Sequence, residues 1–318
     1  MGKLDISTKK YMSNSDRFAD AFNHIMPDNW QVIAEDLTEL DTNLFEIPYG
    51  IDAKEPVQRV RDLTRNMIIK YDDRAIYAIG GLENESKVNY AMPVKALILD
   101  LLNYTKQINE AAKSHKEHKD YGELNGEFLS GFHKEDRLIP VITLTIHFEN
   151  KRWDGPRNIR EMFSMTDPGI MKFLPDYEIN LISPYEIDDF SDFDTDLGAV
   201  LSYIKASGEK KKLEELTSSD ERFRHLARDA FDVINDATDS KLKVIEKEGK
   251  IDLCTAIKEI REEGRQEGIL EGDMLALERV AINMLKENGQ TISFIARMTG
   301  LSEDRVLNLA RENGIAVV

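Results

Sequence analysis

The order of the apolar runs between residues 67 and 148 constrains the fold more than any other feature of the sequence. Two short runs at 67–69 and 75–79 flank the polar turn YDDR, which predicts a hairpin of adjacent strands. Apolar residues then recur at helical spacing over 92–112, and the run at 138–148 is rich in β-branched residues. Two strands, a helix and a further strand in this order predict a mixed α/β layered core.

Flanking segments add to this core on both sides. Residues 15–26 predict a helix capped by Ser13 or Ser15, because apolar residues recur there at helical spacing. Residues 177–182 resemble a further strand, and the chain becomes mostly helical after Leu197.

Glycine spacing separates a linker from the parts on either side. We expect an α/β domain over 1–245, a linker helix over 246–275 and a helical tail over 276–318. Within the linker, glycines recur every four residues from Gly264 to Gly272. This spacing is typical either of a weak, solvated helix or of a surface that a second chain approaches closely, because each glycine destabilises a helix by about 1 kcal/mol.

The tail has the pattern of a helix-turn-helix unit, in which Ser302 caps a last helix over 303–312. One interpretation makes this a DNA recognition helix, with Arg305 and Arg311 on phosphates or bases. The other is a dimerisation or partner-docking tail. Over 278–312 the basic residues are matched by an equal number of acidic ones, which is a poor electrostatic footprint for DNA. The sequence favours neither.

Composition excludes some classes of function. Lys and Arg number 42 against 59 Asp and Glu, and the net charge of −17 excludes a broadly basic nucleic-acid coat but not a local site. Cys254 is the only cysteine, so an intrachain disulfide and a Cys-rich zinc site are excluded. The opening MGKLDISTKK lacks the apolar core of a secretory signal, and no apolar run approaches the roughly 20 residues of a membrane span. We expect a cytoplasmic protein with no membrane contact.

Three carboxylates stand out: Asp62 at the start of the first hairpin strand, and Glu83 and Glu85 at the end of the second. Alternate residues of a strand share a face, so Glu83 and Glu85 should project together, and Lys87 would join them if the strand continued. Carboxylates gathered in one place repel one another unless a cation is bound, and Mg²⁺ prefers such oxygen ligands. Solvated strand ends remain the plain alternative.

Longer stretches around these carboxylates resemble the PD-(D/E)XK nuclease-family transposases, the group that includes the recombination-promoting nucleases (Rpn). The resemblance is carried by RVRDLTRN, which contains Asp62, and by AIGGLENESKVNYAMPVKALILDLLNYTKQI, which contains Glu83. It continues in EFLSGFHKEDRLIPVITLTIHF, WDGPRNIREM, LPDYEINLISP and TDLGAVLSYIK, and in the glycine-interrupted helix with its tail. The matching segments follow the right order over nearly the whole chain.

The resemblance implies a restriction-endonuclease-like α/β fold and Mg²⁺- or Mn²⁺-dependent cleavage of DNA, as in transposition, recombination or another mobile-element process. Asp62 matches the motif Asp, and Glu83 matches the first acid of the E-x-K/Q element. The third position departs from the family, because Glu85 replaces Gln or Lys; it could serve as an extra metal ligand or a general base. Lys87, or as a second choice Lys95, could supply the displaced cation. The alternative is a catalytically degenerate DNA-binding or protein-interaction module.

Two further expectations concern the histidines and assembly. The six histidines show no convincing metal-ligand spacing, and His115 and His118, in the polar stretch 114–126, are interpreted as loop residues. Cutting both strands of a duplex with a single metal site per chain usually requires two chains, so we expect a homodimer held by the helices after Ile251.

Overall fold

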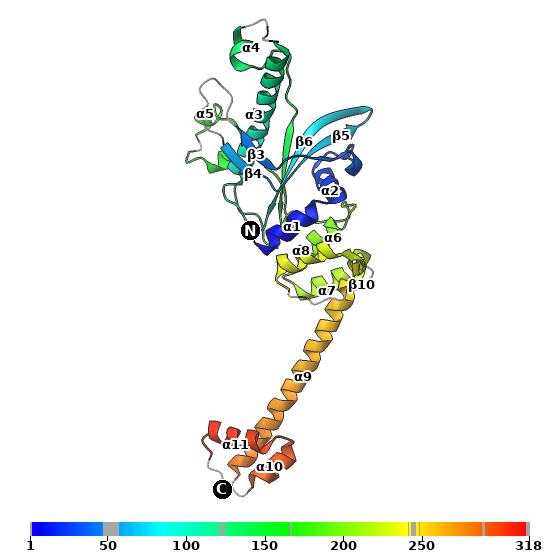
Figure 1. Ribbon diagram of the computed structural model, residues 1–318. Coiled ribbons are helices and arrows are strands. Elements are labelled where there is room, and N and C mark those ends of the chain that lie inside the picture. Colours follow the sequence, from blue (N-terminus) through cyan, green and yellow to red (C-terminus); the bar gives the residue numbers. More distant parts are fainter. Residues whose placement is uncertain are drawn as a thin grey trace. The chain divides into compact units, whose positions relative to one another are not determined.

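The computed structural model describes residues 2–46, 57–120, 122, 125–165, 167–240, 242, 246–247, 249–287 and 290–315 (Figure 1). The chain divides into two compact units, Met1–Cys254 and Thr255–Val318. Among the described residues, no helix combines the length and the apolar character needed to cross a lipid bilayer.

A mixed sheet forms the centre of the first unit. Its strands within the described part of the chain are β1 (Trp30–Val32), β2 (Thr38–Glu39), β5 (Leu63–Tyr71), β6 (Arg74–Glu85), β7 (Val141–His147) and β8 (Asn180–Ile182). They lie in the order β1-β5-β6-β7-β8, and β2 also pairs with β5. The pairs β1–β5, β2–β5 and β5–β6 are antiparallel, whereas β6–β7 and β7–β8 are parallel. The mixed α/β core that the sequence predicts is therefore confirmed.

The remaining elements of the first unit surround this sheet. The α-helices are α1 (Lys3–Met12), α2 (Ser15–Ile25), α3 (Met92–His118), α4 (Asn125–Ser130), α5 (Pro168–Met171), α6 (Leu197–Ala206), α7 (Lys210–Ser219) and α8 (Arg228–Thr238). The 3-10 helices are η1 (Ala34–Asp36), η2 (Ile159–Met162), η3 (Pro184–Glu186) and η4 (Glu221–Arg224). Short strands outside the main sheet are β3 (Asn43–Glu46), β4 (Val57–Val60), β9 (Leu226–Ala227), β10 (Glu246–Lys247) and β11 (Lys250–Ile251).

Strands β5 and β6 form the hairpin expected from the apolar runs. Tyr71 pairs with Arg74 across the turn, and the register continues without interruption until Leu63 lies opposite Leu82. The parallel partner β7 then requires a long crossover, which α3 and the segment after it provide. This arrangement places β6 between β5 and β7, and its last residues, 83–85, extend beyond β5 and pair with β7 alone.

Two successive glycines of β6 let groups approach both faces of the sheet closely. A Cβ atom on Gly80 would come within 3.1 Å of the Phe22 ring and 3.2 Å of the Phe18 ring, both from α2. A Cβ atom on Gly81 would lie 1.4 Å from the Arg61 guanidinium on the other face. The absence of side chains at this pair therefore leaves room for a different group on each face of the sheet.

The structure corrects two expected helix boundaries. Asn14, rather than Ser13 or Ser15, caps α2 by accepting the backbone N–H of Arg17 at 3.1 Å. Helix α3 continues to His118, so the polar stretch that begins at residue 114 starts as helix and not as loop. The chain from 113 to 118 contains no Pro or Gly, and its polar side chains are tolerated because they lie on the surface of the helix.

The boundary between the two units differs from the expected one at residue 245. Strand β11 pairs with both β10 and β9, so the chain remains in the first unit until Cys254. A single helix, α9 (Leu253–Lys286), then replaces the expected linker helix and the first helix of the tail. The helix is continuous because glycine lowers helix stability without interrupting the backbone hydrogen bonds.

The C-terminal helices form the helix-turn-helix arrangement predicted from the sequence. Helix α10 (Ile292–Thr299) ends at Gly300, which is left-handed with φ 74°. Ser302 then caps α11 (Glu303–Glu312) by accepting the backbone N–H of Arg305. Their core consists of the buried residues Ala281, Leu285, Ile295, Ala296, Val306, Leu309 and Ala310.

Candidate active site

The ends of β5 and β6 and the start of α3 bring together Asp62, Glu83, Glu85 and Lys95, which we call the carboxylate–lysine centre. Asp62 immediately precedes β5, and its Oδ2 accepts the backbone N–H of Asn84 at 2.8 Å. This hydrogen bond fastens the carboxylate to β6 at the point where β5 no longer pairs with it. The sequence therefore placed Asp62 correctly at the junction of the two strands.

Glu83 and Glu85 share one face of β6 and converge on the same amine. The Lys95 Nζ lies 2.9 Å from Glu83 Oε2 and 2.7 Å from Glu85 Oε1. Glu83 is only 1% exposed, and its second oxygen, Oε1, has no hydrogen-bond partner. A buried carboxylate oxygen without a partner is energetically costly, which makes Glu83 Oε1 a candidate ligand for a cation.

Burial and pairing act in opposite directions on these groups. Burial raises the pKa of the Glu83 carboxyl above its usual value, although the nearby Lys95 ammonium opposes that rise. Burial lowers the pKa of Lys95, but Glu83 and Glu85 outweigh it, and the net effect is a raised pKa. Lys95 is therefore charged at neutral pH, whereas Glu83 is a carboxyl group that protonates more readily than usual.

The structure distinguishes the two lysines considered as the displaced cation. Lys87 lies two residues beyond the end of β6, where the strand pattern has stopped, and its side chain is exposed. Lys95 reaches the carboxylates from the first turns of α3, and its side chain is 37% exposed. The second choice from the sequence is thus the lysine that contacts Glu83 and Glu85.

A largely buried polar network lies beside this centre on the same face of the sheet. Arg61 is 0% exposed and pairs with Asp100 of α3 at 2.5 Å. Arg61 also donates to Thr143 Oγ1 at 2.6 Å, and Asp100 accepts hydrogen bonds from Thr143 and from Tyr177. The network joins the segment just before β5 to β7, to α3 and to Tyr177, on the face that carries Glu83. The sequence analysis did not single out Arg61; the signal was its position next to Asp62 and opposite the glycine pair.

Strand β7 contributes two further polar side chains to this face. Thr145 pairs in register with Glu83, and His147 pairs with Glu85. Thr145 Oγ1 and both ring nitrogens of His147 are buried without hydrogen-bond partners. Burial lowers the pKa of His147, so the imidazole is neutral at physiological pH. Polar residues at alternate positions of an apolar strand were the signal that sequence analysis missed.

The donor set suits a hard divalent cation of the Mg²⁺ class. Such an ion takes one or two protein carboxylates and completes its shell with water and substrate oxygens. Glu83 offers an unpartnered oxygen, and Asp62 retains a second oxygen beyond its bond to Asn84. Glu85 Oε1 accepts from Lys95, as Glu83 Oε2 does. The carboxylates of Asp62, Glu83 and Glu85 do not form a set whose donor atoms all lie within 4.8 Å of one another, so an ion held here would need water or substrate oxygens for much of its shell.

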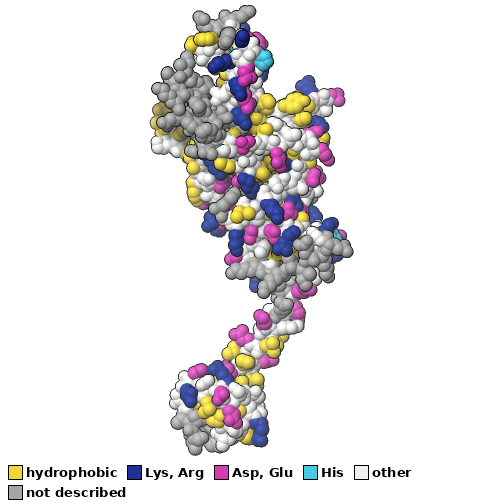
Figure 2. All heavy atoms as spheres, viewed as in Figure 1, with side chains coloured by type: hydrophobic (Ala, Val, Ile, Leu, Met, Phe, Trp, Pro, Cys, Tyr) yellow, Lys and Arg dark blue, Asp and Glu magenta, His cyan; other side chains and the backbone are white. Residues whose placement is uncertain are grey.

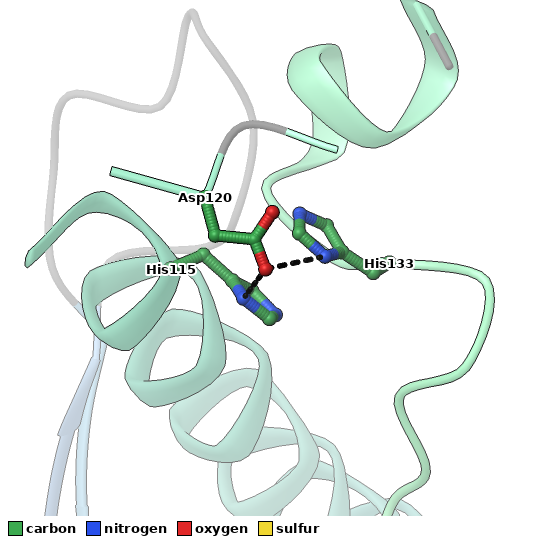
Figure 3. A group of neighbouring side chains, drawn as sticks. All are labelled: His115, Asp120 and His133. Carbon is green, nitrogen blue, oxygen red and sulfur yellow. Dashed lines mark ion pairs between the residues drawn. The ribbon is translucent and has the colours of Figure 1, made fainter. Parts of the chain in front are cut away.

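One compact donor set within the described residues lies elsewhere and was missed by the spacing argument. It consists of His115, Asp120 and His133, which we call the histidine cluster (Figure 3). Eighteen residues separate its two histidines in the chain, so no local spacing could reveal it.

No family model, no curated protein and no solved structure matches this chain. The carboxylate–lysine centre is therefore interpreted from its own geometry.

Proposed function

We propose that this protein is a metal-dependent endonuclease that hydrolyses DNA phosphodiester bonds, with a restriction-endonuclease-like core of the transposase and recombination-promoting type. The observation that carries the proposal is the buried Glu83 carboxylate, whose Oε1 is unpartnered while its Oε2 lies 2.9 Å from the Lys95 amine. Such a group is costly to bury and has a raised pKa, which is characteristic of functional sites. The resemblance of the surrounding segments supports the same conclusion.

Each residue of the centre has a distinct role in this proposal. Asp62 and Glu83 hold the cation, Mg²⁺ or Mn²⁺, which when bound would lower the pKa of a coordinated water and neutralise charge on the phosphate. Lys95 places a permanent positive charge beside these carboxylates, in the role of the lysine missing from the third motif position. Glu85 acts through Lys95 as a positioning residue, since its Oε1 accepts from the amine at 2.7 Å.

Plasmid nicking by the purified full chain tests the proposal most directly. We expect cleavage with Mg²⁺ or Mn²⁺, none with chelator, and loss of cleavage in Asp62→Ala and in Glu83→Ala. Asp73→Ala is a matched control, because Asp73 is an exposed carboxylate at the turn of the same hairpin. Cleavage that survives both site substitutions would show that the activity belongs to another site or another protein.

The alternative function is a nuclease-derived DNA-binding or protein-interaction module without catalysis. One observation favours it: the Lys95 amine already neutralises Glu83 and Glu85, which reduces the attraction of the site for a second cation. Titration with Mg²⁺ and Mn²⁺ distinguishes the two functions, because only a nuclease should show binding that depends on Asp62 and Glu83. Glu85→Gln or Glu85→Lys adds a second criterion: a marked rise in cleavage would identify a weakened enzyme.

DNA binding must overcome a net charge of −17. On the visible face of the first unit, Lys and Arg side chains are interspersed with Asp and Glu (Figure 2). In the tail, Arg305 pairs with Glu278 at 2.6 Å and with Glu312 at 3.2 Å. Its guanidinium charge is therefore already neutralised by carboxylates of the second unit. We therefore expect DNA affinity to depend on the divalent cation and to fall steeply with salt.

The proposal includes a homodimer formed through α9. Leu270, Met274 and Leu277 are exposed and recur at helical spacing in line with the buried Ala281. The glycines from Gly264 to Gly272 lie about 150° away around the helix at 100° per residue, so the apolar stripe rather than the glycine stripe is the expected contact. Apolar side chains on α9 are visible in Figure 2.

Light scattering on the full chain tests this association. We expect a dimer that dissociates in the double substitution Leu270→Glu, Met274→Glu and persists in Leu275→Glu, a control at an exposed leucine about 130° away around the same helix. A full chain that is monomeric at micromolar concentration would contradict the dimer.

A further inference from the structure

The histidine cluster joins the C-terminal end of α3 to the loop that follows α4. His115 lies in the last turn of α3, Asp120 follows the helix, and His133 belongs to the loop after α4 (Figure 3). A donor atom from each lies within 4.8 Å of the other two, and no other such set of three is found among the residues that the structure describes. None of these residues belongs to the carboxylate–lysine centre, and Lys95 lies roughly 30 Å from His115 along the helix axis.

The three donor atoms of the cluster lie somewhat farther apart than the ligands of a tetrahedral ion. Asp120 Oδ2 lies 3.7 Å from His115 Nδ1 and 3.9 Å from His133 Nδ1. A zinc ion with ligands at about 2.0–2.1 Å holds its ligand atoms about 3.3 Å apart in tetrahedral geometry. Binding would therefore draw each imidazole nitrogen closer to Asp120 by roughly half an ångström. Figure 3 shows both Nδ1 atoms facing the same carboxylate oxygen.

The carboxylate of Asp136 orients His115 through a separate hydrogen bond, which does not involve Asp120. Asp136 Oδ2 lies 2.9 Å from His115 Nε2 and also accepts the backbone N–H of His133 at 2.7 Å. A histidine that binds a metal through one nitrogen usually donates the other N–H to a carboxylate, which fixes the tautomer. A neutral His115 that donates to Asp136 carries its proton on Nε2, and its Nδ1, on the side of Asp120, is then available to bind an ion.

Burial leaves the cluster open on one side. The side chains of His115 and His133 are 22% and 13% exposed, whereas Asp120 is 58% exposed and leaves an open side for entry and for a fourth ligand. The two imidazole rings stack with centroids 3.6 Å apart and planes inclined by 15°, so one ring must rotate about its χ2 bond before both Nδ1 lone pairs can point at the same ion.

We propose that His115, Asp120 and His133 form a zinc site in which Asp136 positions His115. Two imidazoles and one carboxylate favour Zn²⁺ over Mg²⁺ or Ca²⁺, which prefer oxygen-only ligands. The ion fastens the end of α3 to the loop after α4 and closes the segment between them. The site is independent of the nuclease proposal, because it shares no residue with the carboxylate–lysine centre.

Titration of the metal-free full chain, without a histidine tag, with Zn²⁺ tests the proposal. We expect a single equivalent to bind, with affinity reduced at least ~100-fold in His115→Ala and in His133→Ala, and about 10- to 100-fold in Asp136→Asn. His118→Ala is the matched control, because His118 is exposed on the last turn of the same helix. Co²⁺ in place of Zn²⁺ should give the intense visible bands of a tetrahedral site, and these bands should vanish in His133→Ala.

Circular dichroism of the metal-free variants separates lost ligation from lost folding, since the substituted side chains are partly exposed. Wild-type protein that binds Zn²⁺ no more tightly than the His115→Ala, His133→Ala double variant would overturn the proposal. Zinc that is lost in Glu83→Gln but retained in His133→Ala would also overturn it, because the ion would then belong to the carboxylate–lysine centre.

Discussion

The carboxylate–lysine centre and the histidine cluster occupy opposite ends of the same helix, α3, and they are built in different ways. The first gathers oxygen donors and an amine at the middle of a sheet, with Glu83 1% exposed. The second gathers imidazoles and carboxylates where a helix meets a loop, with Asp120 58% exposed. The same helix thus carries a buried centre with an unpartnered carboxylate oxygen and a surface cluster whose donors already face one another.

The two sites differ energetically because Glu83 is buried and the histidine cluster is partly exposed. A buried carboxylate has a raised pKa and an unsatisfied oxygen, so it stores free energy that a bound cation and substrate can release. Removing a partly exposed histidine pair from water costs little free energy. An ion bound there would stabilise the fold chiefly by joining two segments of chain. The four predictions below test whether the two sites behave independently.

Arg61→Met is expected to have the largest effect, because it removes one partner of a buried ion pair beneath the carboxylate–lysine centre. Asp100 would be left buried and unpaired, which should lower the free energy of unfolding by about 3–5 kcal/mol. Urea denaturation measures the change. Arg137→Met, an exposed substitution near the histidine cluster, should alter stability by no more than about 0.5 kcal/mol. Equal changes in the free energy of unfolding would show that the network beside the carboxylate–lysine centre contributes no more to stability than an exposed side chain near the histidine cluster.

Lys95→Met should reduce DNA cleavage about 10²- to 10³-fold, the loss expected when a group that stabilises transition-state charge is removed. Because the Lys95 ammonium lowers the pKa of Glu83, its loss should also shift the acid limb of the pH–rate profile to higher pH. Lys113→Met, an exposed lysine near the other end of α3, is the control and should leave cleavage unchanged. An unshifted acid limb would show that Lys95 does not act on Glu83.

Each metal should stabilise the protein through its own site. At a free concentration 100 times its dissociation constant, an ion that binds only the folded chain raises the free energy of unfolding by about 2.7 kcal/mol. The Zn²⁺ effect should disappear in His133→Ala and persist in Glu83→Gln, and the Mg²⁺ effect should show the reverse. Thermal unfolding with each ion measures both effects, and a loss of both in either variant would mean that the sites are coupled.

Glu83→Gln should give the smallest effect, a gain in stability of on the order of 1 kcal/mol for the metal-free protein at neutral pH. Burial raises the pKa of Glu83 in the folded chain, so its protonation stabilises the fold at low pH, and this contribution is lost as pH rises through the raised pKa. The amide is neutral at every pH, and the gain should therefore shrink below the ordinary pKa of about 4.5. Glu110→Gln, exposed on α3, is the control and should show no such dependence.

Elements whose pattern is local could be predicted from the sequence. The hairpin of β5 and β6, the core of α3, and the capped helices α10 and α11 all follow from hydrophobic periodicity and cap residues within short windows. The positions of Asp62 and Glu83 at the ends of paired strands follow from the same hairpin, because register and alternation determine which residues meet.

Contacts between distant segments were decided only by the tertiary structure. Lys87 lies nearer to Glu85 in sequence, but the strand ends before it, and packing of α3 on the sheet brings Lys95 to the carboxylates instead. Arg61 reaches Asp100 only because the glycine pair of β6 leaves room for its side chain. His115 meets His133 because the chain turns back after α4, and such a return depends on the packing of whole elements rather than on any spacing of residue types.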